Sequence, residues 1–476
     1  MANGNQPKLM VEEERLEPFH LYQEMLEESK MTDIIPLLES FVKKAQKMGA
    51  DEVEFFAQNI RTKTAKFETN NLKSAVADLI EGVGIRVLKN NSLGFASVNS
   101  FSEARIEEGL KEALAIAKVT PPEKFYYLSD KHKITKIDNL YDKAIESFTM
   151  DDTIDNSNLL LETSLQADSR VTIDSGTFNA TIRENTIVNS NGINFSEKKS
   201  IFDYMVFGMA VDGDDIGSFD YNFDAVVSKK EIDVVTTGKE FAENCVRNLN
   251  AQKTEAFEGP AIFTPNAVTE LFWLLVSAAI STNIQMGSSF LADKLGDKVA
   301  VDNLSIIDDG TLPNQAASSS FDREGVPHKK YPIIDKGVFT GVLYDSFTAH
   351  KEGLASTGHG AGSYRNIPAI WVTNLEILPG KLPSEKLISE IDHGVIINRI
   401  SASPDPISGD FSASLKGAQL VKKGEITDTL KEITAVGNIF SNLNTITGIS
   451  KDTKAIRGNQ SWFVPHIIMD EIKFVS

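Results

Sequence analysis

The chain has 476 residues, of which 41% are hydrophobic and 24% are charged, as in an ordinary globular protein. This length exceeds what one hydrophobic core usually serves, so we expect two or three domains. The formal net charge is −19, which leaves no basic surface for a phosphate backbone or an anionic membrane. We therefore expect no direct contact with nucleic acid and none with a membrane.

Targeting and redox features favour the cytoplasm. Cys245 is the one cysteine of the sequence, so no intrachain disulfide can form. Residues 1–15 lack the basic-then-apolar pattern of a secretory signal. The most apolar run, 271–280, is about half as long as a helix that spans a bilayer. We predict a cytoplasmic protein.

Residues 1–30 are predicted to be an acidic N-terminal extension, and residues 31–253 an N-terminal α+β domain. Apolar residues recur at helical spacing from Asp33, and Gly49 stands where the helix should stop. A strand is expected at 51–60. Two more strands are expected within 79–99, around the Asn-rich turn KNNSLG.

The rest of this domain alternates helices with an antiparallel meander. Helical patterns cover 103–119 and 153–167, and a further one covers roughly 236–248. Between the second and third of these helices, turn signals at 189–192 and 212–215 separate strand-like stretches. Helices and antiparallel strands thus share one domain of mixed α/β content.

Residues 254–476 are expected to form a strand-rich C-terminal domain, and the whole chain is of the α+β class. The polar opening and the paired Gly259 and Pro260 suggest a boundary near residue 254. A helix capped by Asn266 is predicted to run to Ser281, and mostly strands follow. The stretch KKYPIIDKGVFTGVLYDSF predicts a hairpin that turns at residues 335–337.

Histidine spacing gives little support for a metal site. No histidine is followed by glutamate, so HExxH is absent. His350 and Glu352 point to different sides of a helix, and His359 follows a glycine in a probable turn. We interpret these three residues as a surface helix that runs into a loop, and we predict no metal in this chain.

A serine-rich stretch, ISGDFSASLKG at 407–417, offers candidate nucleophiles. Ser412 with Asp410 and a distant base such as His359 could form a hydrolytic site, although the sequence does not place the base beside the serine. The alternative interpretation is a polar turn between strands, and we favour it.

Several of these stretches together resemble the TldD/PmbA family, which is known as modulators of DNA gyrase and as metallopeptidases. The resemblance covers residues from about 33 to the end. It is carried by EGVGIRVLKNNSLGFAS, the NSNG turn, FDREGVP, TGVLYDSFTAHKEGLASTGHG and SGDFS. Their order and spacing are more specific than any one of them alone.

The resemblance distinguishes two kinds of chain. TldD-type chains carry HExxxH on a helix early in the C-terminal domain, and a cysteine near the C-terminus completes the metal site. Here the corresponding helix, 267–281, has the run FWLLV at 272–276, and the C-terminal stretch has no cysteine. His466 is there, but a lone histidine is more often structural than a ligand. The chain therefore resembles the PmbA type, also called TldE, with zinc expected in a TldD-type partner.

The resemblance implies a noncatalytic subunit that shapes a chamber for flexible peptides or unfolded proteins. Its partner would be a TldD-type chain in a heterodimer, or a second copy in a homodimer. Two alternatives remain open: a self-sufficient homodimeric hydrolase, and a regulatory homodimer that binds peptides without chemistry. An acidic chain is a poor direct DNA binder, so any gyrase effect would come from processing a protein or peptide.

The candidate site residues follow from these hypotheses. Catalytic candidates are His359, Asp410 and Ser412. Substrate-binding candidates are Thr357, Gly358, His359, Gly360, Ser408, Gly409 and Asp410.

Overall fold

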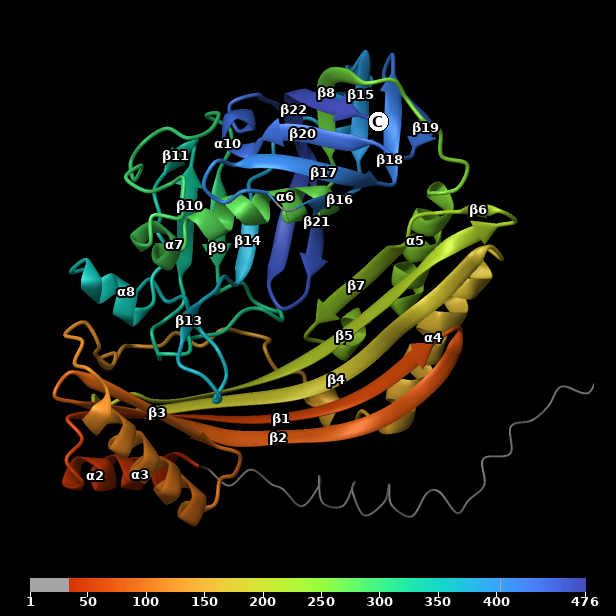
Figure 1. Ribbon diagram of the computed structural model, residues 1–476. Helices are drawn as coiled ribbons and strands as arrows, with labels where there is room; N and C mark the ends of the chain where they lie inside the picture. The colour runs from red at the N-terminus through yellow and green to blue at the C-terminus, as the bar shows by residue number, and fades with distance from the viewer. Residues whose placement is uncertain (1–33, 403) are drawn as a thin grey trace, which may run out of the picture.

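The computed structural model describes residues 34–402 and 404–476, so the acidic extension predicted at 1–30 lies outside the described residues. A long curved antiparallel sheet makes up most of the first half, and its concave side faces a strand-rich second half (Figure 1). The predicted α+β class is confirmed. Within the described ranges, no helix combines the length and apolar character that a membrane crossing requires.

The N-terminal sheet has seven strands in the order β3-β2-β1-β4-β5-β6, and β7 pairs with β5. All the pairings are antiparallel. Four strands are 17 to 19 residues long, which gives the sheet its reach across the molecule. The strands are β1 (Glu52–Glu68), β2 (Asn71–Lys89), β3 (Ser92–Val98), β4 (Val171–Asn189), β5 (Asn194–Asp212), β6 (Asp215–Ile216) and β7 (Asp220–Val226).

Four helices cover this sheet in two pairs, one pair at each end (Figure 1). They are α2 (Ile35–Lys47), α3 (Glu103–Val119), α4 (Met150–Ala167) and α5 (Val234–Arg247). In α3 the buried residues Ile106, Leu110 and Ala113 recur at intervals of three and four, so one face of the helix meets the sheet. Each pair of helices closes its own hydrophobic cluster.

The predictions for these helices are largely confirmed. The expected span 103–119 is the observed one, and Gly49, with φ of +92°, follows the end of α2. The third helix begins at Met150 rather than Thr153, because Thr149 and Asp152 form a reciprocal capping box. Asp233 similarly caps α5, so that helix also begins earlier than predicted.

The C-terminal half is built on a mixed sheet of 13 strands, whose main order is β11-β10-β9-β14-β22-β8-β15-β18-β19. Two pairings in this sheet, β14 with β22 and β8 with β15, are parallel. The strands are β8 (Phe257–Phe263), β9 (Ile306–Asp309), β10 (Lys330–Asp335), β11 (Val338–Phe339), β14 (Asn374–Ile377), β15 (His393–Ile397), β16 (Arg399–Ala402), β17 (Asp410–Lys416), β18 (Ala418–Lys422), β19 (Glu425–Leu430), β20 (Thr434–Asn438), β21 (Ile446–Arg457) and β22 (Ser461–Val475).

Smaller elements complete this half. A separate two-stranded ladder joins β12 (Gly360–Ala361) to β13 (Ala369–Ile370). The helices are α6 (Pro265–Ala278), α7 (Ser281–Gln285), α8 (Ser346–Lys351), α9 (Ser384–Ser389) and α10 (Ile439–Asn442). The predicted hairpin is confirmed, since Asp335 pairs with Val338 across a turn in which Lys336 and Gly337 have positive φ.

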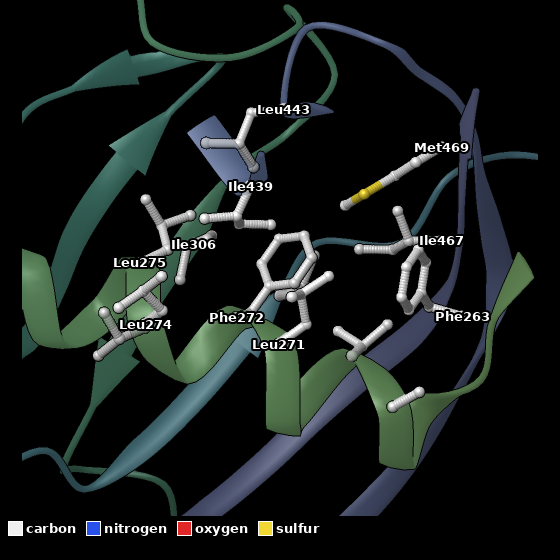
Figure 2. Close-up of a cluster of buried hydrophobic side chains, with 14 of the residues drawn as sticks. Phe263, Leu271, Phe272, Leu274, Leu275, Ile306, Ile439, Leu443, Ile467 and Met469 are labelled. Carbon is white, nitrogen blue, oxygen red and sulfur yellow. The ribbon is translucent and has the colours of Figure 1, made fainter. Parts of the chain in front are cut away.

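Helix α6 lies in the centre of the C-terminal hydrophobic core (Figure 2). Leu271, Phe272 and Leu275 are completely buried. They pack among apolar side chains of β8, β9, β22 and α10, namely Phe263, Ile306, Ile439, Leu443, Ile467 and Met469. The packing of this helix therefore sets the positions of four neighbouring elements.

The predicted bounds of this helix are wrong at both ends. The helix begins at Pro265, whose missing N–H needs no partner in the first turn, and Thr264 rather than Asn266 is the N-cap residue. It ends at Ala278. Ser281 belongs to the next helix, α7, which follows an extended Ile280.

Gly94 tests the contact between α3 and the sheet. A Cβ atom at this position of β3 would lie 1.9 Å from the carbonyl oxygen of Ala113, so Gly94→Ala forces α3 away from the strand. We expect the variant to lose about 3 kcal/mol of unfolding free energy in a denaturant titration. Gly458→Ala is the control, because its Cβ would meet no atom nearer than 3.4 Å. Equal loss in both variants would contradict this packing.

Candidate functional site

His359 lies in the protein interior with both ring nitrogens engaged. Its Nδ1 lies 2.7 Å from the hydroxyl of Thr357, and its Nε2 lies 3.0 Å from a carboxylate oxygen of Asp308 on β9. The side chain is 2% exposed. A hydroxyl on one ring nitrogen and a carboxylate on the other is the arrangement of a catalytic triad, but the Thr357 hydroxyl is buried and also donates to the backbone carbonyl of Tyr344 at 3.1 Å. In this geometry His359 instead holds its own segment against β9.

The glycines beside His359 allow a close contact with a second loop. Gly358 has φ of +81°, and a Cβ there would lie 2.7 Å from the carbonyl oxygen of Pro327. The backbone N–H of Gly360 donates to Asp322, and the N–H of Arg323 donates to the carbonyl of Gly360, each at 2.8 Å. The glycine-rich segment is therefore docked on the FDREGVP loop.

In the second predicted set, Ser408, Asp410 and Ser412 are exposed, whereas Gly409 is buried. Asp410 accepts a hydrogen bond from the side-chain amide of Asn438, and Ser412 lies two residues further along the strand, on the same exposed face. Our interpretation of 407–417 as a turn is wrong beyond Gly409. From Asp410 onward the stretch is strand β17, because its alternate residues are apolar and buried.

The structure does not bring the two predicted sets together. His359 is bonded to Thr357 and Asp308, whereas Asp410 and Ser412 lie on β17, well separated from the β12–β13 ladder in Figure 1. His350 and Glu352 are also apart from His359. His350 contacts the carbonyl of Phe125, and the carboxylate of Glu352 accepts hydrogen bonds from Gln285 and Tyr344.

A buried ionic cluster joins the two halves of the protein. Glu54 on β1 accepts hydrogen bonds from Arg86 at 2.6 and 2.9 Å and from Arg323 at 2.8 Å. Arg86 also reaches Glu324 at 3.0 Å. Burial opposes the charge on Glu54, but the two guanidinium groups outweigh burial and lower its pKa. Asp322 is a further buried carboxyl beside this cluster, and burial raises the pKa of both Asp322 and Glu324.

Two residues of this cluster, Arg323 and Glu324, belong to the motif FDREGVP. FDREGVP carries part of the family resemblance, yet we assigned no role to its charged residues. Arg323 and Glu324 are 4% and 2% exposed, and the guanidinium carbon of Arg323 lies 3.8 Å from the centre of the Phe56 ring. Adjacent charges in a motif that is otherwise apolar or glycine-rich could have indicated a buried ion-pair site.

Lys199 makes another buried contact between the two halves. Its ammonium group donates to the carbonyl oxygen of Ser318, and the residue is 6% exposed. Burial lowers the pKa of Lys199 from its ordinary value of 10.5 to about 8. The folded protein therefore binds this proton less tightly than the unfolded chain does.

A cleft of about 640 Å³ opens where β7 of the first half faces α6, β16 and the turn between β21 and β22. Trp273, Trp371 and Trp462, which are all the tryptophans of the sequence, line it. Glu270 of α6 also lines it, with one carboxylate oxygen 3.1 Å from the hydroxyl of Tyr221 and the other accepting from the backbone N–H of Ile400 at 2.6 Å. Sequence reasoning missed this cleft, because its residues are far apart along the chain.

Comparisons with known proteins agree with this architecture. Residues 257–476 match the model described as the PmbA/TldA metallopeptidase C-terminal domain, and residues 53–117 match domain 1 of the same metallopeptidases. Together these models cover more than half of the chain. The chain belongs to the TldD/PmbA family.

Relatives of both family types resemble the chain to a similar degree. The metalloprotease PmbA of Escherichia coli O157:H7 is 27% identical over 78% of this chain and 81% of its own length. A metalloprotease TldD homologue of Buchnera aphidicola is 26% identical over 79% of this chain and 80% of its own length. The crystal structure of TldE from Thermococcus kodakarensis superposes with a TM-score of 0.86 at 23% identity, covering 92% of this chain and all of that one. This last likeness concerns the fold.

The family's metal does not fit the residues that this TldD/PmbA chain offers. Phe272, Leu275 and Val276 of α6 are fully buried carbon side chains, and carbon cannot ligate zinc. Glu270 is the one acidic residue of α6, and this helix has no histidine and no cysteine. Within residues 34–402 and 404–476, no three His, Cys, Asp or Glu side chains are grouped so that they could hold a metal ion.

Glu54→Gln tests the ionic cluster that joins the two halves. The variant removes the carboxylate that both Arg86 and Arg323 contact and leaves the buried Arg323 without that ion pair, so we expect the unfolding free energy to fall by about 3–5 kcal/mol. Glu108→Gln is the matched control, since it removes an exposed carboxylate paired with Arg105. Urea titrations of both variants measure the effect, and a Glu54 variant as stable as the control would refute the role of the cluster.

Lys199→Met tests the buried lysine through its pH dependence. Between pH 8 and 10.5 the unfolded chain holds the proton that folded Lys199 has released, so wild-type stability should rise with pH in this window. We expect the stability of the wild type relative to the variant to rise there by about 2–3 kcal/mol in chemical denaturation. Parallel pH curves for the two proteins would show that the lysine keeps its ordinary pKa.

Proposed function

We propose that this chain is a noncatalytic, PmbA/TldE-like subunit of a TldD/PmbA-type metallopeptidase. The observation that carries the proposal is the buried apolar surface of α6, the helix on which a TldD-type chain would carry its metal ligands. Phe272 and Leu275 of this helix pack into the core. Neither side chain has an atom that could bind a metal in any rotamer. The metalloprotease names of the relatives support the peptidase-related part of the proposal.

The partner in this proposal is a TldD-type subunit that carries the zinc. This chain then contributes walls and binding surface to a shared chamber, while the partner contributes the metal. The long concave sheet in Figure 1 suits such a wall. A homodimer is the alternative assembly, and in that case the chain would bind peptides without cleaving them.

Flexible peptides or unfolded proteins are the proposed substrates. An extended peptide can add to the edge of a sheet through backbone hydrogen bonds, which tolerates many sequences. Both halves of the chain are rich in strands. Among the strands that the structure describes, β16 pairs only with β17. Folded proteins would offer no free backbone to such an edge.

An activity assay with and without a TldD-type partner tests this division of labour. We expect no hydrolysis of an unstructured peptide by this chain alone, and chelator-sensitive hydrolysis after the partner is added. Replacing the glutamate of the partner's HExxxH by glutamine should abolish the activity, since that subunit holds the reacting groups in this proposal.

Variants of this chain provide the control. Ser412→Ala and Asp410→Asn change exposed side chains of β17, and we expect both to leave the activity of the pair unchanged. Hydrolysis by this chain alone that resists chelator and falls at least about a hundredfold in Ser412→Ala would instead support a self-sufficient hydrolase. Saturable peptide binding with no turnover, with or without a partner, would support a regulatory homodimer.

A further inference from the structure

Aromatic rings dominate the cleft beside α6. Trp273 and Trp371 lie with their ring centres 4.9 Å apart at an interplanar angle of 46°, so they form a corner rather than a flat stack. Trp462 and Phe223 also line the cleft. Trp371 is 42% exposed, which is unusual for the largest apolar side chain and leaves part of its ring open to a ligand.

The charge of the cleft is negative. Among the described residues that line it, Glu270 has the one charged side chain. Behind it lie Arg399 and Asp220, which form an ion pair at 3.1 Å, and the guanidinium of Arg399 comes no closer than 3.8 Å to the carboxylate of Glu270. Burial raises the pKa of both Glu270 and Asp220, and the guanidinium of Arg399 opposes that rise.

The carboxylate of Glu270 is held in a fixed position. The hydroxyl of Tyr221 and the backbone N–H of Ile400 each donate to one of its oxygens. Each carboxylate oxygen can accept a further hydrogen bond. The side chain keeps 23% of its surface exposed, so it is available to a ligand without first breaking these contacts.

We propose that this cleft binds the positively charged side chain, lysine or arginine, of an extended peptide. Tryptophan rings attract a cation through their electron-rich faces, and a neighbouring carboxylate adds charge attraction and a hydrogen-bond acceptor. The apolar stem of such a side chain would contact the rings, as long cationic side chains commonly do. The volume of about 640 Å³ lies within the range of sites for small ligands.

The peptide backbone has a place beside the cleft. Ile400, Ser401 and Ala402 of β16 line the cleft, and this strand pairs with β17 on one side only among the described strands. The N–H of Ile400 stays bonded to Glu270, so a peptide would pair with the remaining backbone groups of β16 and place alternate side chains toward the cleft. This inference rests on the proposed function for one point, that the ligand is a peptide. The further point is that the cleft selects a lysine or arginine side chain of that peptide.

Capped pentapeptides with one variable central residue among alanines test this inference on the full chain. The central residue is lysine, norleucine or glutamate, so that length is kept while charge changes. Because every tryptophan of the chain lines the cleft, intrinsic fluorescence reports occupancy directly. We expect the lysine peptide to quench the fluorescence saturably and to bind about tenfold more tightly than the norleucine peptide.

Two variants assign the preference to the cleft. Glu270→Gln keeps an acceptor for the N–H of Ile400 but removes the charge, and we expect the lysine and norleucine peptides then to bind equally. Glu385→Gln removes the same charge from exposed α9, away from the cleft, and should leave the tenfold preference intact. Circular dichroism establishes that both variants fold like the wild type.

The outcomes separate this inference from the proposed function. Equal binding of lysine and norleucine peptides by the wild type, preference for glutamate, or no saturable quenching by any peptide would each overturn the cationic site. None of these results changes whether the chain holds a metal or needs a partner for hydrolysis. Conversely, hydrolysis by this chain alone would overturn the noncatalytic assignment and leave a measured lysine preference standing.

Discussion

Burial of the apolar face of α6 is the constraint on which the rest of the structure depends. Leu271, Phe272 and Leu275 fill the space between β8, β9, β22 and α10, and each is completely buried (Figure 2). Replacing such residues by polar ligands would remove apolar packing and bury unpaired polar groups, which both cost stability. These three positions of α6 therefore serve the packing of the core.

The opposite edge of the same helix faces the other half of the protein. Glu270 accepts a hydrogen bond from Tyr221 of β7, and Arg457 near the β21–β22 turn pairs with Asp224 of β7 at 2.6 Å. At the far end of the sheet the cluster around Glu54 makes a second, buried link. With the contact of Lys199 to Ser318, the two halves are joined at several places, and the tryptophan-lined cleft lies beside the contact of Glu270 with Tyr221. Its shape depends on the interdomain contacts as much as on α6.

Local sequence patterns predicted the parts of the fold that local interactions determine. The helix at 103–119 and the hairpin at 335–337 were predictable because spacing, breakers and turn residues lie within one short stretch. The cluster around Glu54 was not, since Arg323 lies 269 residues away along the chain. The tryptophan cleft was missed for the same reason. The strand from Asp410 could have been predicted, because Phe411, Ala413 and Leu415 alternate with polar residues.

The candidate site residues show the same limit. Glycines and a histidine in TGHG indicated a loop with close backbone contacts, and the structure places that loop against Asp322 and Arg323. The sequence did not reveal that Asp308 and Thr357 would occupy both nitrogens of His359. Hydrogen-bond partners from distant segments determine which role a histidine can take, and a single sequence does not identify those partners.

The metal content of the purified chain tests the central claim most directly. Plasma mass spectrometry on full-length protein made without a histidine tag gives the amount of zinc and iron per chain. A noncatalytic subunit in which Phe272, Leu275 and Val276 of α6 fill the core should carry far less than one metal ion per chain, before and after incubation with zinc and gel filtration. One tightly held zinc or iron per chain would contradict the account and would require ligands that the present geometry does not bring together.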